Sequence, residues 1–493
     1  MPKTALLEIG VEEIPASVVL PALKQMEKLA AEGLERLRLG CDGIRTYGTP
    51  RRLALVATGV AEKQPDVTKE MKGPPADRAF DENGEPTKAA LGFCKKQGLE
   101  VGDLEVRETE KGTFVYAQVS QPGLAAAEVL GELWAEIIGK LAFPKTMRWA
   151  DLSMRFARPI RWLAALYGTD TVAFEVAEVK SGNASRGHRF LSEGDVEFAS
   201  ADEYLDKLEG ASVIADHRRR QEMIRERAIA AAAERGGSPR IDPSLLEEVG
   251  FLVEYPTCLC GSYPEQYLKL PEPALVTVMA KHQRYFPVED EGGELMPLFV
   301  AIRNGDDRAL DTVRAGNEMV IVPRFADAEF YYTEDTKTKL ADRLEALDRV
   351  AFMDRQGSMR AKTDRIAELS KTTCDALGLD PSVPAEAARL CKCDLVTLMV
   401  QDLTSLQGVM GGEYARLEGV GEAVCSAVRD HYMPAFAGDD VPETDAGKVV
   451  SLADKLDSLA ACFAMDMIPK GASDPYGLRR RAAGVLAIVL DAR

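Results

Sequence analysis

The chain has 493 residues, of which 46% are hydrophobic and 28% charged, a composition typical of globular proteins and unlike that of disordered, collagen-like or coiled-coil chains. At about 150 residues per domain, this length predicts roughly three domains. The 61 Lys and Arg residues against 79 Asp and Glu residues give a net charge of −18. This balance argues against a free-standing, non-specific nucleic-acid binder, because phosphate binding needs a basic surface.

The first part of the sequence combines the strand and helix periodicities that are typical of an α/β region. Apolar runs predict strands at 4–9, 52–60 and 113–119. Apolar positions at helical spacing predict helices at 17–38 and 125–142. The polar stretch 62–90 is rich in Lys, Asp, Pro and Gly and is predicted to be a loop or an inserted element.

Two stretches are basic within this acidic chain. Lys and Arg outnumber Asp and Glu by eight to four in 144–191 and by seven to four in 216–240. The second stretch is predicted to be a helix that ends at Gly236-Gly237. A solvated helix face explains such a charge run, and RNA contact is the alternative that stays open.

Residues 251–302 are predicted to form strands and short turns, and helical periodicity dominates after about residue 325. Four helices are predicted, at 348–377, 384–403, 413–432 and 444–465. The fold class is therefore multidomain α+β, with mixed α/β domains followed by an all-α domain. We predict an N-terminal α/β domain at 1–143, a mixed α/β region with basic stretches at 144–325, and a helical domain at 326–493. The chain ends inside a helical pattern, which predicts a fragment of a longer protein.

Membrane, disulfide and zinc chemistry are not expected. No run of about 18 apolar residues occurs, and the N-terminus is unlike a signal peptide, so a cytoplasmic location is expected. The nine Cys include two C-x-C pairs, Cys258/Cys260 and Cys391/Cys393. We interpret them as reduced thiols, because zinc sites usually have C-x-x-C spacing and four ligands.

Common catalytic motifs are missing from the sequence. It contains no phosphate-binding G-x-x-x-x-G-K-[ST], no G-x-G-x-x-G after a strand, no G-x-S-x-G and no H-E-x-x-H. We therefore assign no catalytic residue to this chain.

Asp and His residues in the helical part resemble those of HD-type phosphohydrolases, which hold divalent metals between helices. The candidates are Asp394, His431 and Asp454. Where a His-Asp pair is expected, the chain has Cys391-Lys392, and a Lys ammonium repels a divalent cation. A degenerate HD-like site without metal is therefore predicted, with an HD-type metal-dependent phosphohydrolase as the alternative.

Thirteen motifs that occur in order resemble a known family. They are LLEIGVEEIP (6–15), TPRRLA (49–54), PKTMRW (144–149), RFARPIRWL (155–163), SGNASRGHRF (181–190), FLVEYP (251–256), KHQRYFPV (281–288), RFADAEFYY (324–332), LCKCDLVTLMVQDL (390–403), LQGVMGGEYA (406–415), DHYMP (430–434), LADKLDSL (452–459) and GASDPYGLRRRAAGV (471–485). The series is similar to the β subunits of bacterial heterotetrameric glycyl-tRNA synthetases, from residue 4 to the end of the chain.

The resemblance implies an α2β2 enzyme that attaches glycine to its tRNA with ATP. The active site, with ATP and Mg²⁺, is expected on the α subunit, and no cofactor is expected on this chain. The expected partners are the α subunit and tRNA(Gly). No association with a membrane is expected. The β subunit is expected to be a tRNA-binding scaffold with α/β domains, a degenerate HD-like helical domain and a C-terminal anticodon-binding domain. That last domain should follow the DPYGLRR motif, so this chain is expected to lack it.

Basic side chains beside aromatic ones are the candidates for tRNA contact, since they combine charge with stacking. The candidates are Arg51, Arg52, Lys145, Arg148, Arg155, Arg158, Arg186, His188, Arg189, Lys281, His282 and Arg284. In the KHQRYF segment, Tyr285 and Phe286 are the neighbouring aromatic residues.

Structural roles are the alternative for several of these residues. Arg51 and Arg52 are candidates for pairing with Glu12 and Glu13. Arg148 and Arg161 each stand beside a Trp and are candidates for structural cation–π contacts or ion pairs. Their neighbours, Trp149 and Trp162, are predicted to anchor a hydrophobic core.

Overall fold

The structure, a computed structural model, describes residues 1–81, 84–109, 112–353, 355–471 and 474–492. It is mixed α/β, as predicted. Contacts between Cα atoms divide the chain into two compact units. Unit 1 comprises 1–227, 243–257 and 302–307, and unit 2 comprises 228–242, 258–301 and 308–493.

Unit 1 is built on a sheet with the strand order β2-β3-β1-β7-β10-β9, with β8 paired to β7. Its strands are β1 (Lys3–Val11), β2 (Gly43–Thr49), β3 (Arg52–Val60), β7 (Ile160–Tyr167), β8 (Asp170–Thr171), β9 (Glu175–Val176) and β10 (Val179–Gly182). The predicted strands at 4–9 and 52–60 are confirmed, whereas β2 was not predicted. Because β7 pairs with the central strand β1, the sheet extends past the predicted domain boundary at residue 143.

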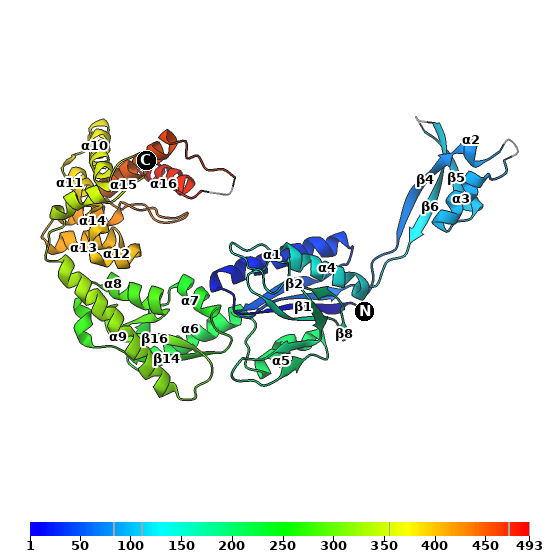
Figure 1. The fold of residues 1–493 in the computed structure, drawn as a ribbon, viewed down its shortest axis with the longest axis horizontal. Helices are drawn as coiled ribbons and strands as arrows, with labels where there is room; N and C mark the ends of the chain where they lie inside the picture. Colours follow the sequence, from blue (N-terminus) through cyan, green and yellow to red (C-terminus); the bar gives the residue numbers. More distant parts are fainter. Residues whose placement is uncertain (82–83, 110–111, 354, 472–473, 493) are drawn as a thin grey trace. The chain divides into compact units, whose positions relative to one another are not determined.

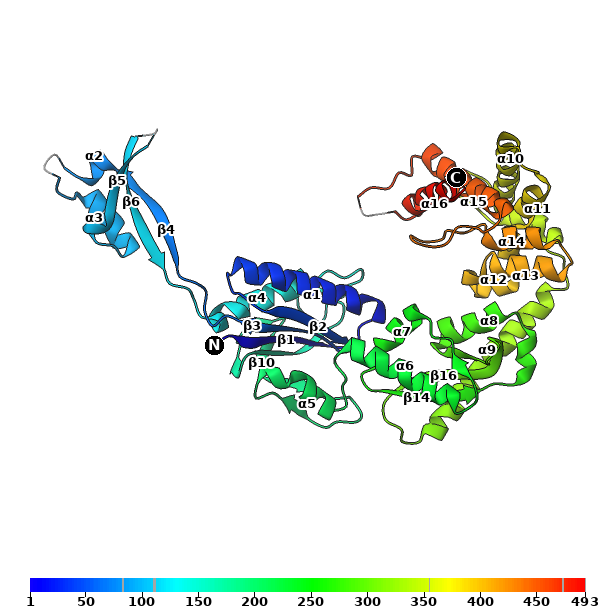
Figure 2. The same cartoon turned by 180° about the vertical axis from the view of Figure 1, so that it is seen from behind.

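Both faces of this sheet are buried, and side chains alternate between them. Leu7 and Ile9 of β1 belong to a core with the helices α1 (Ala16–Arg36) and α4 (Ala126–Lys140), which confirms the two predicted helices. Leu6 belongs to a second core with residues of α5 (Tyr204–Gly210). Figure 1 and Figure 2 show α1 and α4 together over one face and α5 over the other.

Residues 67–121 form an inserted element with its own sheet, in the order β4-β6-β5. It contains β4 (Val67–Pro75), α2 (Ala76–Ala79), α3 (Lys88–Gln97), η1 (Val101–Asp103), β5 (Leu104–Thr109) and β6 (Gly112–Gln121). Ala79, Ala90 and Val115 form its small core. The inserted element and the strand at 113–119 are confirmed, although much of the polar stretch 62–90 is regular structure rather than loop.

Short elements complete unit 1 and lead into unit 2. The pair β11 (Ala184–Arg186) and β12 (Asp195–Glu197) precedes η2 (Ala201–Glu203) and α5. The basic stretch 216–240 contains α6 (His217–Ala233), which confirms a helix that ends before Gly236. α7 (Pro243–Gly250) follows.

Unit 2 begins with a four-stranded sheet in the order β13-β15-β16-β14. Its strands are β13 (Ser238–Pro239), β14 (Pro256–Ser262), β15 (Phe286–Glu289) and β16 (Leu295–Asn304), with η3 (Glu265–Lys269), α8 (Glu272–Thr277) and the π-helical η4 (Val278–Gln283) between them. The long α9 (Leu310–Asp335) follows, and its Phe325 packs on Tyr263. α9 therefore extends across residue 325, where the predicted mixed region ends and the predicted helical domain begins, because the helix shares a core with the sheet.

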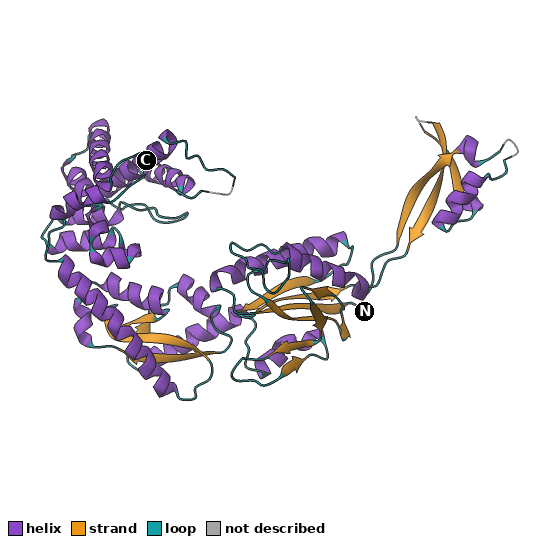
Figure 3. Ribbon diagram, in the orientation of Figure 1, coloured by secondary structure: helices purple, strands orange, loops and turns teal. Residues whose placement is uncertain are grey.

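The remainder of unit 2 is helical, as predicted (Figure 3). It contains η5 (Ala341–Arg349), α10 (Met359–Leu377), α11 (Ser382–Leu390), η6 (Cys393–Val396), α12 (Leu398–Asp402), η7 (Thr404–Leu406), α13 (Val409–Leu417), α14 (Glu422–Asp430), α15 (Asp445–Ala464) and α16 (Leu478–Asp491). The helix predicted at 444–465 is confirmed.

The other three predicted helices were too long. The helix at 348–377 begins only at Met359, after the cap Ser358 accepts a hydrogen bond from the Ala361 amide. The helix at 384–403 is broken between α11 and α12. The helix at 413–432 is broken at Gly419, whose φ of +78° ends α13 in the left-handed region that favours glycine.

Among the described residues, no helix is both long enough and apolar enough to cross a membrane.

Candidate functional site

A buried polar cluster in unit 2 is built on α15. Thr444 caps this helix by accepting a hydrogen bond from the Gly447 amide. Asp454, Asp457 and Ser458 are spaced at i, i+3 and i+4, so they share one helix face, and all three are buried. Buried polar groups require partners, and other helices supply them.

The Lys392 ammonium lies at the centre of the cluster. Its Nζ is 2.9 Å from Asp454 Oδ2 and 2.8 Å from His431 Nε2. It also lies 3.8 Å from the centroid of the Tyr432 ring. An ammonium group has three N–H donors, and these three contacts use all of them.

His431 is the neutral partner of Lys392. Its Nδ1 lies 2.6 Å from the Val428 carbonyl oxygen, which only accepts, so Nδ1 carries the proton and Nε2 accepts from Lys392. Burial, together with the Lys392 charge, holds the pKa of His431 well below its usual range.

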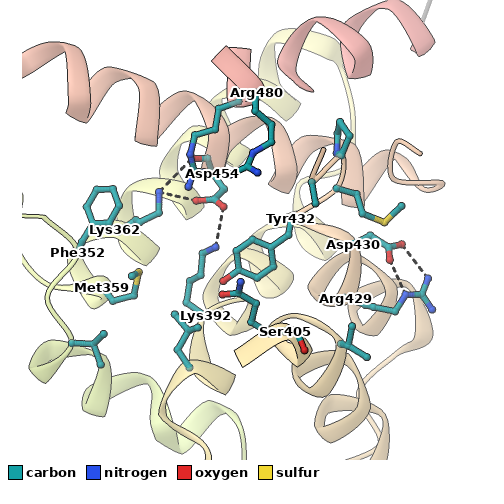
Figure 4. A pocket seen from close by; sticks show the side chains of 18 residues that line it. Phe352, Met359, Lys362, Lys392, Ser405, Arg429, Asp430, Tyr432, Asp454 and Arg480 are labelled. Carbon is teal, nitrogen blue, oxygen red and sulfur yellow. Dashed lines mark hydrogen bonds and ion pairs between the residues drawn. The ribbon is translucent and has the colours of Figure 1, made fainter. Parts of the chain in front are cut away.

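Asp454 is the anionic partner of two lysines. Lys362, from α10, places its Nζ 2.7 Å from Asp454 Oδ1 (Figure 4). The same Nζ lies 3.0 Å from Asp457 Oδ2. It also donates to Ser458 Oγ at 2.8 Å. Burial alone would raise the pKa of Asp454, but the ammonium groups of Lys392 and Lys362 outweigh it and hold this pKa well below its usual range.

The cluster carries an excess of positive charge. Arg365 adds an ion pair to Asp457, with Nε 2.5 Å from Oδ1. Two ammonium groups and one guanidinium group therefore face two carboxylates, with a neutral imidazole beside them. Where a divalent ion would lie between Asp454 and His431, the structure has the Lys392 ammonium. No group of three or more His, Cys, Asp or Glu side chains in the part of the chain that is described has the arrangement of a metal site.

Two of the five predicted HD-like residues have separate roles. The Asp394 carboxylate accepts hydrogen bonds from the Gly408 and Gly411 amides at 2.5 and 3.1 Å. Burial raises the pKa of Asp394 to about 6. Cys391 is buried, its Sγ lies 3.2 Å from the Ala388 carbonyl oxygen, and burial raises its pKa to about 12. The structure thus brings only Lys392, His431 and Asp454 together.

The cluster forms part of the wall of a cavity of about 890 Å³ that lies entirely within unit 2. The other walls are partly apolar and partly cationic. Phe352, Met359, Tyr432 and Met433 supply apolar surface, and Arg480 and Arg481 of α16 supply charge. At a further wall, Arg429 and Asp430 form a bidentate pair, with contacts of 2.7 and 3.1 Å.

Arg51 and Arg52, predicted to contact tRNA, are buried in unit 1 and are inaccessible to RNA in this structure. Arg52 is completely buried, and its Nη2 lies 3.2 Å from Glu254 Oε1. Arg51 Nη1 lies 3.5 Å from Glu254 Oε2. The proposed partners were also wrong, because the turn between β2 and β3 faces Glu254 rather than Glu12 or Glu13.

Glu12 and Glu13 pair instead with exposed arginines. Arg161 Nε lies 3.3 Å from Glu12 Oε1. Arg189 lies 3.2 Å from Glu12 Oε2 and 3.4 Å from Glu13 Oε1. An ion pair for Arg161 was one of its two predicted roles.

Glu8 is the second buried carboxylate of unit 1. It accepts hydrogen bonds from Tyr204 Oη at 2.6 Å, from Trp162 Nε1 at 2.5 Å and from Ser185 Oγ. Trp162 is a core residue, as predicted. Glu8 and Glu254 were missed by the sequence reasoning. A carboxylate among the apolar residues of LLEIGV is the signal that was present for Glu8, since acidic side chains are almost never fully buried without partners.

The remaining candidates of unit 1 divide by exposure. Lys145, Arg148, Arg155, Arg186 and Arg189 are exposed, and so is Phe190, at 79%. Arg158 is half-buried. His188 is buried, with Nε2 3.0 Å from Asn304 Oδ1, so its side chain is inaccessible to RNA.

The KHQRYF segment keeps its charges outside and its aromatic rings inside. Lys281 and Arg284 are exposed, and His282 is half-buried. Tyr285 and Phe286 are buried, and Tyr285 stacks on Phe299 with centroids 4.5 Å apart. The prediction that these two rings accompany the basic side chains at an RNA surface is therefore wrong, because the sheet core needs them.

Residues 5–493 match the model of a protein family described as "Glycyl-tRNA synthetase beta subunit". The match includes every motif of the buried cluster and of the cavity. The chain belongs to this family.

Curated relatives agree with the assignment to this β-subunit family. The glycine–tRNA ligase β subunit of Desulfitobacterium hafniense (strain Y51) is 46% identical over 495 residues, which cover 100% of this chain and 72% of the relative. The β subunit of Moorella thermoacetica is 45% identical, covering 100% and 71%. That of Clostridioides difficile (strain 630) is 44% identical, covering 99% and 71%.

A solved structure also matches part of the chain. It is that of a predicted HD superfamily hydrolase from an uncultured Thermotogales bacterium, which is 17% identical and covers 31% of this chain and 87% of its own. Its TM-score of 0.21 is too low to support any argument about the fold.

Several residues of the unit 2 cavity were not predicted for this β-subunit chain. Lys362 lies in a helix that gave no chemical signal, and only the fold brings it to Asp454. Arg480 and Arg481 lie in the quoted motif GASDPYGLRRRAAGV. Three consecutive arginines were the available signal, but a charge run by itself does not distinguish a cavity wall from a solvated helix face.

Proposed function

We propose that this chain acts as the β subunit of a glycine–tRNA ligase, in which it assembles with an α subunit and positions tRNA(Gly) for the ATP-dependent attachment of glycine. The observation that carries this proposal is the family match over residues 5–493, together with relatives that are 42–46% identical over nearly all of this chain. The glycine, ATP and Mg²⁺ sites belong in this proposal to the α subunit.

Of the basic candidates, the exposed ones are those that we propose contact tRNA. They are Lys145, Arg148, Arg155, Arg186, Arg189, Lys281 and Arg284. Each presents a cation at the surface, where a phosphate displaces bound counterions at little desolvation cost. The buried Arg51, Arg52 and His188 instead support the fold of unit 1.

The helical part of unit 2 is, in this proposal, an HD-type bundle that has replaced its metal by an internal cation. The support is the position of Lys392 Nζ, within 3 Å of both the His431 and the Asp454 side chains. The expectation that an anticodon-binding domain follows the DPYGLRR motif in this family, and that this chain lacks it, stays a prediction.

A metal-dependent phosphohydrolase is the alternative, and this geometry opposes it. A divalent ion between Asp454 and His431 would have to displace an ammonium group that makes three contacts, and would then lie beside Lys362. Coulomb repulsion from both lysines disfavours that exchange.

The decisive experiment combines this chain with the α subunit of a relative and measures glycine-dependent charging of tRNA(Gly) and co-elution by size. We expect co-elution, and faster charging than by the α subunit alone. Separate elution, or equal charging with and without this chain, would contradict the proposal.

A salt titration of tRNA binding gives an independent test. The affinity is expected to fall steeply with salt, because each phosphate contact releases counterions. Salt-independent binding would contradict a role for the exposed basic residues. Phosphate release from nucleotides by this chain with Mn²⁺, abolished by Asp454→Asn, would instead support the phosphohydrolase.

A further inference from the structure

We propose that the cavity of unit 2 binds a nucleotide, whose phosphate lies against Arg480 and Arg481 and whose base lies against the apolar wall of Phe352, Met359 and Tyr432. The inference concerns this cavity rather than the exposed basic residues proposed to contact tRNA. It does not depend on the proposed role in tRNA charging, because binding is measured on this chain alone. The nucleotide is either free or part of a single-stranded RNA.

Most cations around the cavity are already neutralised or saturated by contacts. Lys392 uses its three donors on Asp454, His431 and the Tyr432 ring. Lys362 donates to Ser458 and pairs with Asp454 and Asp457. Arg429 is held by Asp430.

Arg480 and Arg481 differ from these cations. Neither side chain makes a hydrogen bond or an ion pair with any residue that the structure describes. Their neighbour Arg479 donates to the Gly471 carbonyl at 2.5 Å and does not line the cavity. Two guanidinium groups therefore face the cavity with their donors uncommitted, and Figure 4 shows Arg480 extending from α16 toward the wall that holds Asp454.

The packing of α16 fixes these two arginines at the cavity. Leu478, Gly484 and Ile488 are the buried residues of the helix, and Arg481 lies on the same face, three residues after Leu478. A Cβ on Gly484 would lie 2.7 Å from Lys455 Cε, so the glycine lets α16 lie close to the Lys455 side chain of α15. The Asp474 carboxylate accepts from the Leu478 and Arg479 amides at 2.9 Å and fixes the first turn.

The charge of the site selects an anion. Arg480 and Arg481 bring two positive charges to a cavity whose other wall cations are paired with Asp454, Asp457 and Asp430. A guanidinium fork binds a phosphate through two parallel N–H donors, which favours phosphate over a monodentate anion. Since the first amides of α16 are already capped by Asp474, side chains rather than the helix terminus make this anion site.

The size and the walls of the cavity select more than an inorganic anion. Small-molecule sites usually measure about 300–1,000 Å³, and this cavity of about 890 Å³ exceeds what one phosphate fills. Phe352 and Tyr432 each hold a lysine ammonium over the ring, at 4.4 and 3.8 Å from the centroid, and both remain partly exposed at the cavity wall. Flat aromatic and thioether surfaces suit a nucleobase.

The test is calorimetric titration of this chain with AMP, with adenosine, with inorganic phosphate and with a single-stranded RNA hexamer. We expect AMP or the hexamer to bind at least about tenfold more tightly than adenosine or inorganic phosphate, because neither of these two probes engages both walls. Tight binding of AMP indicates a free nucleotide, and tight binding of the hexamer with weak binding of AMP indicates RNA. Binding of neither probe would overturn the proposal.

Variants locate the site. Arg480→Gln with Arg481→Gln is expected to weaken the binding of the tighter probe at least about tenfold, whereas Arg480→Lys with Arg481→Lys, which keeps the charge and loses the fork, should weaken it less. Arg479→Gln removes a charge from the same helix turn and should leave the affinity within about twofold. Equal losses in Arg479→Gln and in the double Gln variant, at unchanged thermal stability, would show a general charge effect and overturn the site.

Discussion

Unit 1 buries guanidinium groups, whereas unit 2 buries ammonium groups, and the two networks have different surroundings. In unit 1, Arg52 reaches Glu254 and the Arg186 carbonyl, and Arg220 donates to carbonyl oxygens of Gly48 and Gly250. Burial lowers the pKa of Arg220 to about 10. A planar guanidinium with five donors joins several chain segments at once, and it is enclosed by them.

In unit 2, the ammonium groups of Lys362 and Lys392 satisfy a compact set of side chains and lie at the wall of a cavity. The comparison shows that buried charge alone does not mark a functional site. The unit 1 network joins strands and loops and leaves its arginines inaccessible, whereas the unit 2 network leaves a surplus of positive charge beside a space that a ligand can enter.

The largest effect is expected from Arg52→Met in unit 1. This change leaves Glu254 buried with weaker compensation, and breaking a buried pair by removing one partner costs about 3–5 kcal/mol. All three Trp residues, Trp134, Trp149 and Trp162, lie in unit 1, so tryptophan fluorescence during urea unfolding measures the stability of that unit. A loss no greater than that of the exposed control Arg161→Gln would show that the network does not stabilise the unit.

A smaller effect is expected from Lys392→Met in unit 2. It leaves His431 Nε2 without a donor, but Lys362 still pairs with Asp454, so the free energy of unfolding should fall by about 1–3 kcal/mol. Hydrogen exchange of the α15 amides measures this change. Lys371→Met, on the exposed side of α10, is the matched control, and equal protection in the two variants would contradict a central role for Lys392.

The pH dependence of unit 2 is expected to depend on His431. Its pKa in the folded protein lies well below the usual 6.5, so the stabilisation is complete above about pH 6.5 and is lost as the pH falls below that value. The loss from His431 amounts to about 1.4 kcal/mol per pH unit, and protonation of the buried Asp394, whose pKa is raised to about 6, opposes part of it. His431→Asn should flatten this slope between pH 6.5 and 5.5 in hydrogen-exchange measurements, and an unchanged slope would assign the pH dependence to other groups.

The smallest effect on stability is expected from Arg189→Gln. Arg189 pairs with Glu12 and Glu13 while exposed, and such pairs contribute less than about 1 kcal/mol. If Arg189 contacts a tRNA phosphate, the same variant should reduce the salt dependence of tRNA binding by about one counterion. An unchanged salt slope would remove Arg189 from the tRNA surface.

Local patterns predicted the elements whose signal lies in neighbouring residues. The apolar run TALLEI became β1, and the apolar spacing of 444–465 became α15. The helices predicted at 384–403 and 413–432 failed because capping and glycine geometry interrupted a periodicity that continued across the breaks. The buried cluster around Lys392 was only partly predictable from the sequence, since Lys392, His431 and Asp454 meet while Asp394 accepts from the amides of Gly408 and Gly411.

The sequence by itself determined the family, through motifs that extend over the whole chain, and the type of most elements, because periodicity is a property of adjacent residues. Only the tertiary structure decided which charges are buried. The Thr49 hydroxyl donates to the buried Glu254 carboxylate, which is 205 residues away, and Lys392 donates to Asp454, which is 62 residues away, so no local pattern pairs them. A basic motif looks the same in the sequence whether its arginine faces a carboxylate in a core, as Arg52 does, or an open cavity, as Arg481 does. Packing removes the Arg52 guanidinium from water, whereas it leaves the N–H donors of Arg481 available at the cavity.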